Sequence, residues 1–185
     1  MEVVSSNRPS QGLTLISGPS RGGKSRWAEH LLSEYNDVTY VATSSKRQQD
    51  QDWQNRLKKH QERRPKEWTV IESERELIRI VKNLSTDGVL IDSLGGFVAC
   101  HLDQSAKEWD FLVNELIQTL KQHSSKVLIV IEETGWGVVP GSVSGCLFRD
   151  RLGKMAQDLE EFSIASWLVI QGRALNLKEL GISVP

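Results

Sequence analysis

The chain has 185 residues, with 23 basic and 24 acidic side chains and a formal net charge of −1 at pH 7. This length fits one domain with a substantial core, and the balanced charge provides no field that would favour nucleic acid. No apolar stretch approaches the ~20 residues that span a bilayer, so neither a nucleic-acid partner nor a membrane span is expected. Cys100 and Cys146 show neither metal-ligand spacing nor a disulfide pattern, which indicates reduced thiols of a cytoplasmic protein.

The first landmark is a strand that runs directly into a glycine-rich loop and a helix. The apolar run Leu13–Ser17 indicates a buried strand, and residues 25–32 have a helical pattern. Between them, Gly18–Ser25 spells G-x-x-x-x-G-K-S. Residues 1–12 are polar and lack the apolar core of a signal peptide. We therefore expect a flexible tail over residues 1–12 and one nucleotide-binding catalytic domain over residues 13–185.

The glycine-rich loop has the chemistry of a triphosphate site. Its backbone N–H groups would converge at the N-terminus of the following helix, where the helix dipole favours phosphate oxygens. Glycine permits positive φ and close approach of the backbone to a ligand. Lys24 can reach the β- and γ-phosphates, and the Ser25 hydroxyl can ligate Mg²⁺. The residues expected to bind a nucleoside triphosphate are Gly18, Pro19, Ser20, Arg21, Gly22, Gly23, Lys24 and Ser25.

Beyond the loop, short apolar runs alternate with helical patterns. Further strands are expected at residues 38–42, 68–71, 89–91, 127–131 and 167–170. Further helices are expected at residues 50–62, 77–84, 109–120 and 148–159. Ser73 and Glu76 have the spacing of a capping box at the start of the helix over residues 77–84. The alternation predicts a single α/β domain with a mostly parallel sheet and helices on both faces.

The second landmark is Asp92, which ends the apolar strand at residues 89–91. An acidic residue at the carboxyl end of a buried strand, beside a phosphate loop, suits a Mg²⁺ partner. Many strands also end in Asp because it forms turns, so it is the phosphate loop that favours the metal role. Ser25 and Asp92 are the expected metal site.

The third landmark is His60, which lies in a basic segment with the pattern of a helix. Arg56, Arg63 and Arg64 share a helical face with it at spacings of three and four residues. Clustered guanidinium groups can bind a triphosphate, and they disfavour protonation of the imidazole, which keeps it a neutral nucleophile. From these residues alone, a solvated basic helix that happens to carry a histidine remains an open alternative.

Together these motifs resemble the CobU-type family of bifunctional adenosylcobinamide kinase / adenosylcobinamide-phosphate guanylyltransferases. The resemblance covers nearly the whole chain after residue 12. It combines the phosphate loop, the spaced histidine and the segment Glu133–Pro140, which spells E-x-G-x-G-x-x-P. Other shared segments lie at residues 40–44, 50–53, 56–57, 64–65, 68–72, 92–94 and 148–153. The resemblance implies a RecA-like P-loop fold, a homotrimer and two reactions on a corrinoid.

The resemblance also implies the site and its substrates. His60 falls at the position of the guanylylated histidine, and the implied substrates are ATP, GTP and adenosylcobinamide, with Mg²⁺ as cofactor. In the first reaction a triphosphate phosphorylates the aminopropanol hydroxyl of adenosylcobinamide. In the second, His60 takes GMP from GTP and passes it to adenosylcobinamide phosphate, which gives adenosylcobinamide-GDP. Nucleotide-binding residues implied outside the loop are Arg56, Arg63, Arg64, Glu72, Asp92 and Glu133.

The chain departs from the family pattern near the expected metal site. Pro19 and Gly22 replace a Gly and a Ser in the loop, which leaves Lys24 and Ser25 in place. After Asp92-Ser93-Leu94 the family tends to have Thr, Trp and a Thr/Ser-Asn pair, whereas this chain has residues 95–100 as GGFVAC. Glu132 stands where Asn is common. These departures concern the kinase step or corrinoid binding, so a different small-molecule P-loop kinase and a nucleotide-binding regulatory module remain open alternatives.

Overall fold

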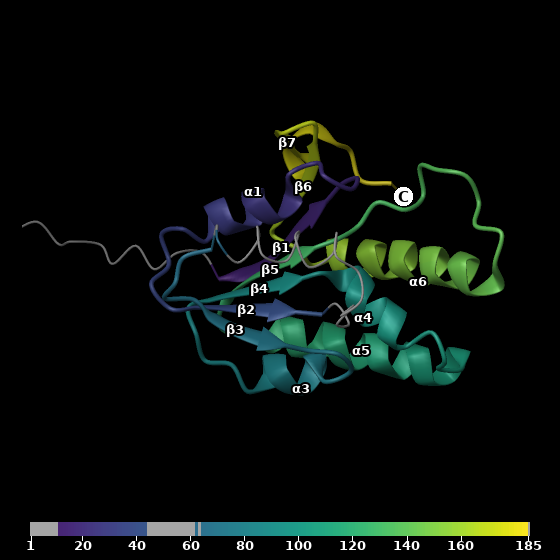
Figure 1. The fold of residues 1–185 in the computed structure, drawn as a ribbon, viewed down its shortest axis with the longest axis horizontal. Helices are drawn as coiled ribbons and strands as arrows, with labels where there is room; N and C mark the ends of the chain where they lie inside the picture. Colours follow the sequence, from purple (N-terminus) through teal and green to yellow (C-terminus); the bar gives the residue numbers. More distant parts are fainter. Residues whose placement is uncertain (1–10, 44–61, 63, 185) are drawn as a thin grey trace, which may run out of the picture.

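The computed structural model describes residues 11–43, 62 and 64–184, and these residues build one sheet with helices packed against it (Figure 1). Its strand order is β3-β2-β4-β5-β1-β6-β7. Neighbouring strands are parallel except β6 and β7, which are antiparallel. The strands are β1 (Gly12–Ser17), β2 (Val38–Ala42), β3 (Thr69–Glu72), β4 (Gly88–Asp92), β5 (Lys126–Val130), β6 (Ala165–Ile170) and β7 (Arg173–Asn176).

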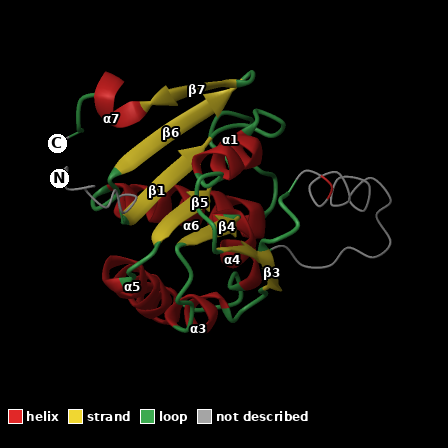
Figure 2. Cartoon of the chain, turned by 90° about the vertical axis from the view of Figure 1, so that its left-hand side faces the viewer, coloured by secondary structure: helices red, strands yellow, loops and turns green. Residues whose placement is uncertain are grey.

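Helices cover both faces of this sheet. Their bounds are α1 (Lys24–Leu31), α3 (Leu77–Lys82), α4 (Leu94–Cys100), α5 (Ala106–Gln122), α6 (Val143–Glu160) and α7 (Leu177–Leu180). Figure 2 shows α1 on one side of the sheet and α3 and α5 on the other. Alternate residues of a strand point to opposite faces, so Leu90 packs with Ala28 of α1, whereas Val89 and Ile91 pack with the helices opposite. The predicted α/β class, with a mostly parallel sheet, is confirmed.

The parallel strands bring the predicted site residues to one edge of the sheet. Ala42 of β2 is opposite Asp92 of β4, and Asp92 is opposite Val130 of β5. Ile16 of β1 is likewise opposite Val130. All of these strands end on the same side, which is the right-hand side of Figure 1. In open α/β sheets ligands bind beyond the carboxyl ends of the strands.

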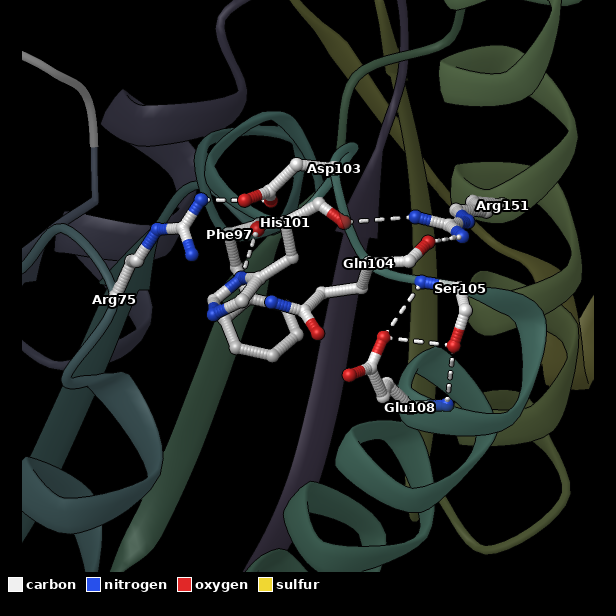
Figure 3. Close-up of polar contacts among 8 residues, drawn as sticks. All are labelled: Arg75, Phe97, His101, Asp103, Gln104, Ser105, Glu108 and Arg151. Atoms are coloured by element: carbon white, nitrogen blue, oxygen red, sulfur yellow. Dashed lines mark hydrogen bonds and ion pairs between the residues drawn. The ribbon is translucent and has the colours of Figure 1, made fainter.

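On the face opposite α1, the junction between α4 and α5 is closed by Arg151 of α6 (Figure 3). Its guanidinium donates to the backbone carbonyls of His101 and Gln104, at 2.8 and 2.7 Å. Its Cζ lies 4.7 Å from the centre of the Trp109 ring. Hydrogen bonds from an ionised donor are stronger than those between neutral groups, so this arginine fixes the C-terminal end of α4.

One predicted helix cap is wrong, although α3 begins at Leu77 as expected. The N-cap of α3 is Glu76, with no side-chain hydrogen bond at the cap, and Ser73 is buried ahead of it. Because Ser73 faces the interior, its hydroxyl does not reach the first turn of the helix. A capping box does occur at the start of α5, where Ser105 and Glu108 exchange side-chain and backbone bonds (Figure 3).

The remaining predicted elements agree with the structure to within a few residues, except for the polar helix at residues 50–62. That helix lies outside the described residues, apart from Glu62. The short elements α4, β7 and α7 were not predicted. Within the described ranges, every helix is too short or too polar to cross a membrane.

Candidate active site

The phosphate loop connects β1 to α1 and is packed tightly against β6. Gly18 has φ +143° and Gly23 has φ +109°, both in the region that favours glycine. A Cβ on Gly18 would collide with the carbonyl oxygen of Val169, and one on Gly22 would lie 2.5 Å from the same atom. These glycines are therefore required both by backbone conformation and by the close approach of β6.

The turn between β6 and β7 supports the loop from outside. Gln171 and Gly172 both have positive φ, at 52° and 75°, as expected for a two-residue hairpin turn. The N–H of Gly172 donates to the carbonyl of Gly22 over 3.0 Å. The antiparallel hairpin at the end of the chain thus fixes the glycine-rich turn of the loop.

Lys24 lies folded into the loop. It is buried, and its Nζ donates to the carbonyls of Gly18 and Pro19 at 2.8 and 2.9 Å. Ser20 and Arg21 are exposed at the tip, and Ser25 occupies the first turn of α1. The ammonium is consequently held by the carbonyl groups of the loop itself, and its binding of phosphate stays a prediction.

Asp92 at the end of β4 is held by a side chain from the neighbouring strand. The Tyr40 hydroxyl donates to Asp92 Oδ2 over 2.9 Å. Burial and the nearby Asp92 carboxylate raise the pKa of Tyr40 well above its ordinary value of 10.0, so the hydroxyl keeps its proton and remains a donor. The buried Arg64 places its Cζ 3.9 Å from the centre of the Tyr40 ring.

Glu133, just beyond β5, faces the phosphate loop. Its backbone N–H donates to the carbonyl of Gly18 over 3.0 Å. Burial raises the pKa of the Glu133 carboxyl above its ordinary value, and the charge of Lys24 opposes that shift. A carboxylate next to the loop lysine can orient that lysine or accept a proton from a substrate. Glu72, by contrast, is exposed at the end of β3.

The structure therefore places the loop, Asp92 and Glu133 at the same edge of the sheet, where Glu133 is bonded to the loop and Lys24 is folded into it. The predicted residues Arg56, His60 and Arg63 lie outside the described residues. Sequence reasoning missed Tyr40 and the β6–β7 turn as supports of the site. The only signal for Tyr40 was a side chain with a hydroxyl group within a buried strand. This signal becomes useful only when the order of the strands is known.

The comparison with protein families agrees with this site. The model described as cobinamide kinase / cobinamide phosphate guanyltransferase matches residues 14–177. The chain belongs to this family. Members of the cobinamide kinase family are bifunctional enzymes of adenosylcobalamin biosynthesis, and this chain is accordingly a kinase and guanylyltransferase.

Curated relatives of the cobinamide kinase family match over most of their length. The bifunctional adenosylcobalamin biosynthesis protein CobU of Escherichia coli K12 is 30% identical over 182 residues, which cover 90% of this chain and 99% of that protein. CobU of Salmonella typhimurium LT2 is 29% identical with the same coverage. CobP of Pseudomonas aeruginosa PAO1 is 29% identical, covering 89% of this chain and 96% of that protein.

Solved structures extend the likeness at the level of the fold alone. An ATPase of a bacterial type III secretion system superposes with a TM-score of 0.57 at 8% identity, over 93% of this chain and 60% of that one. A protein of Pyrococcus horikoshii OT3 superposes with a TM-score of 0.53 at 10% identity, over 93% and 87%. This chain thus shares the overall fold of that ATPase.

Proposed function

We propose that the Gly18–Ser25 loop holds a triphosphate for the phosphorylation of adenosylcobinamide, and that His60 carries GMP from GTP to the phosphorylated corrinoid. The observation that carries the proposal is the placement of Lys24, Asp92 and Glu133 at the edge of the sheet where the phosphate loop begins. Two of these side chains already have fixed partners, since Lys24 is bound to loop carbonyls and Asp92 to Tyr40. Phosphoryl transfer depends mainly on such positioning and on charge stabilisation.

In the kinase step, the hydroxyl oxygen of the corrinoid side chain attacks the γ-phosphorus. The bond from that phosphorus to the β-bridging oxygen breaks, and a nucleoside diphosphate leaves. Lys24 exchanges its two carbonyl partners for phosphate oxygens and stabilises the negative charge on them. The backbone N–H groups of the loop act on the same oxygens. Glu133, whose carboxyl pKa is affected by the charge of Lys24, is proposed to accept the hydroxyl proton.

In the guanylyl step, a ring nitrogen of His60 attacks the α-phosphorus of GTP and expels pyrophosphate. A phosphate oxygen of adenosylcobinamide phosphate then displaces the imidazole, which gives adenosylcobinamide-GDP and regenerates the enzyme. Arg56, Arg63 and Arg64 are proposed to bind the phosphates in this step, and Glu72 to contribute to nucleotide binding. The buried position of Arg64 beside Tyr40 supports a site for this nucleotide close to Asp92.

The residues at this edge fit Mg²⁺. Ser25 offers a hydroxyl and Asp92 a carboxylate, and Mg²⁺ is bound through such oxygen donors. Tyr40 packs in the same cluster as Ala28 of α1, and its bond to Asp92 holds the carboxylate on the α1 side of the sheet. Mg²⁺ held by Ser25 and Asp92 would supply positive charge that neutralises the negative charge developing on the phosphate groups.

We also propose a cytoplasmic homotrimer. The family resemblance implies the trimer, and exposed apolar side chains beyond β5, Trp136, Val138 and Val139, provide surface that association would bury. The free thiols of Cys100 and Cys146 agree with a reducing compartment. Light scattering of the purified protein tests the trimer directly.

Two labelled nucleotides test the two half-reactions separately. With Mg²⁺, α-labelled GTP should leave label on the protein as an acid-labile, base-stable adduct. With adenosylcobinamide present, γ-labelled ATP should transfer label to the corrinoid. Absence of the adduct contradicts the guanylyl step, and absence of labelled corrinoid with γ-labelled ATP contradicts the kinase step.

A further inference from the structure

The turn that follows Asp92 is held by side chains from both neighbouring strands. From the end of β2, Thr43 accepts a hydrogen bond from the Ser93 N–H on its Oγ1 at 2.7 Å and donates that hydroxyl to the Ser93 carbonyl. The Thr43 N–H also donates to the Asp92 carbonyl over 3.1 Å. The peptide groups on both sides of Ser93 are therefore fixed to β2.

From the end of β5, Glu132 holds the other side of the same turn. One carboxylate oxygen, Oε1, accepts the Ser93 hydroxyl hydrogen, and Oε2 accepts the N–H of Gly95 over 3.0 Å. Glu132 is therefore engaged with the backbone and side chain of the turn, whereas its neighbour Glu133 faces Lys24.

The two glycines of α4 fit these two attachments. A Cβ on Gly95 would collide with Oε2 of Glu132 and lie 2.8 Å from its Cδ. A Cβ on Gly96 would collide with the Thr43 hydroxyl and lie 2.6 Å from the Thr43 carbonyl oxygen. Neither glycine has positive φ, so the requirement is for space. Glycine is less favourable than alanine inside a helix, which makes two in succession an unfavourable choice without such a reason.

We propose that Glu132 is a positioning residue for Asp92, and that Gly95 is present because it leaves room for the Glu132 carboxylate. Gly95 and Glu132 are both departures from the family pattern. The glycine lacks a side chain, and the Glu132 carboxylate occupies the space that this leaves. The inference rests on the proposed function, in which Asp92 binds the metal. It assigns Glu132 a hydrogen-bonding role that does not depend on its charge.

This role predicts different outcomes for two substitutions of Glu132. In Glu132→Gln the side-chain amide can donate to the Ser93 hydroxyl while its oxygen accepts from Gly95, so both links survive. In Glu132→Ala both links are lost. We expect Glu132→Ala to lower the affinity for Mg²⁺–ATP about 10- to 100-fold, as for other residues that orient metal ligands, and Glu132→Gln to retain it. Affinity for metal-free ATP should be unchanged in both variants.

Gly95→Ala tests the steric half of the proposal. It should lower Mg²⁺–ATP affinity in the parent chain but cause no further loss in Glu132→Ala, because the carboxylate it displaces is already gone. Gly153→Ala, in α6, is the matched control, since a Cβ there meets no atom within 4 Å. If Gly95→Ala fails to fold, Ser93→Ala takes its place. It removes one link to Glu132 without adding volume, and we expect an intermediate loss of Mg²⁺–ATP affinity.

Calorimetric titration with ATP, with and without Mg²⁺, measures each of these effects. Loss in Glu132→Ala, retention in Glu132→Gln and non-additivity with Gly95→Ala support the proposal. Equal losses in Glu132→Ala and Glu132→Gln would show that the charge acts directly and would overturn it, as would additive effects. A parent protein whose affinity for ATP does not change with Mg²⁺ contradicts the proposed metal site itself. Glu132→Ala that responds to Mg²⁺ as the parent does contradicts the positioning role alone.

Discussion

The hydroxyl of Tyr40 lies 2.9 Å from Oδ2 of Asp92 and joins two neighbouring strands at the edge where the phosphate loop begins. Tyr40 is buried and comes from β2, while Asp92 ends β4. Because Tyr40 keeps its proton, it can act only as a donor to Asp92. The orientation of the proposed metal ligand is therefore set by a residue with no other evident part in the chemistry.

Removing this hydroxyl should weaken the response to Mg²⁺. Tyr40→Phe keeps the ring under Arg64 and deletes one hydrogen bond, so the fold should persist. We expect the Mg²⁺ concentration needed for half-maximal kinase activity to rise about 10-fold. Tyr35→Phe, which removes a hydroxyl near Asp87, at the opposite edge of the sheet, is the control. A requirement equal to that of the parent would show that Asp92 is held adequately by the backbone alone.

Lys24→Ala should weaken nucleotide binding without unfolding the protein. Hydrogen bonds from a charged donor contribute about 1.5–3 kcal/mol, which corresponds to an affinity loss of roughly 10- to 100-fold. Kinase activity should be abolished. Calorimetry measures the affinity, and circular dichroism checks the fold. Lys154→Ala, at an exposed position of α6, should bind as the parent does. Unchanged affinity in Lys24→Ala would remove the case for the phosphate loop.

Gly18→Ala should be strongly destabilising. A side chain at this residue must adopt φ +143° and collides with the carbonyl of Val169. Backbone strain of this kind costs about 1–3 kcal/mol, and displacement of β6 adds to it. Gly141→Ala is the control, since a Cβ at that position meets no atom within 4 Å. Thermal unfolding should show a clear fall in Tm for the first variant only.

His60→Ala should eliminate the guanylyl adduct and the product adenosylcobinamide-GDP while sparing nucleotide binding at Gly18–Ser25. The control is His30→Ala, because His30 is exposed, whereas His101 and His123 bond to backbone carbonyls and are parts of the fold. Mass spectrometry locates the label. An adduct that persists in His60→Ala, or that maps to another residue, would reassign the nucleophile and leave the phosphate loop unaffected.

Glu133 should make stability depend on pH. Burial raises its pKa above 4.5 in the folded protein, so the folded state holds the proton more tightly than the unfolded chain does. The resulting stability is present at pH below 4.5 and is lost as the pH rises through the folded pKa. Glu133→Gln stays neutral, so its stability relative to the parent should grow from about pH 4 to about pH 7. Urea unfolding measures this, and a constant difference would refute it.

The strands and the long helices were predictable because burial leaves a period in the sequence. Residues 127–131 are continuously apolar because both faces of β5 are covered, and Trp109, Leu116 and Leu120 repeat at helical spacing. The helix α4 was not predicted because its first turn contains Gly95 and Gly96, and glycine has poor helix propensity. The reason for those glycines lies in Thr43 and Glu132, which no local pattern connects to them.

The candidate site was predictable where its residues are contiguous and not where they meet across strands. Residues 18–25 form a motif that is local in sequence, and Asp92 was found by its place at the end of a buried strand. Tyr40 lies 52 positions from Asp92, and their contact depends on β2 and β4 being neighbours. Strand order is a property of the whole sheet, so a single sequence gives no direct signal for this contact.

The support that the β6–β7 hairpin gives to the phosphate loop has a consequence for how the protein is made. The nucleotide motif is synthesised before Val169 and Gly172, which shape it. A nascent chain that stops before Ala165 contains every residue of the motif but lacks the backbone against which the loop rests. Nucleotide binding is therefore expected only after the β6–β7 hairpin has been synthesised.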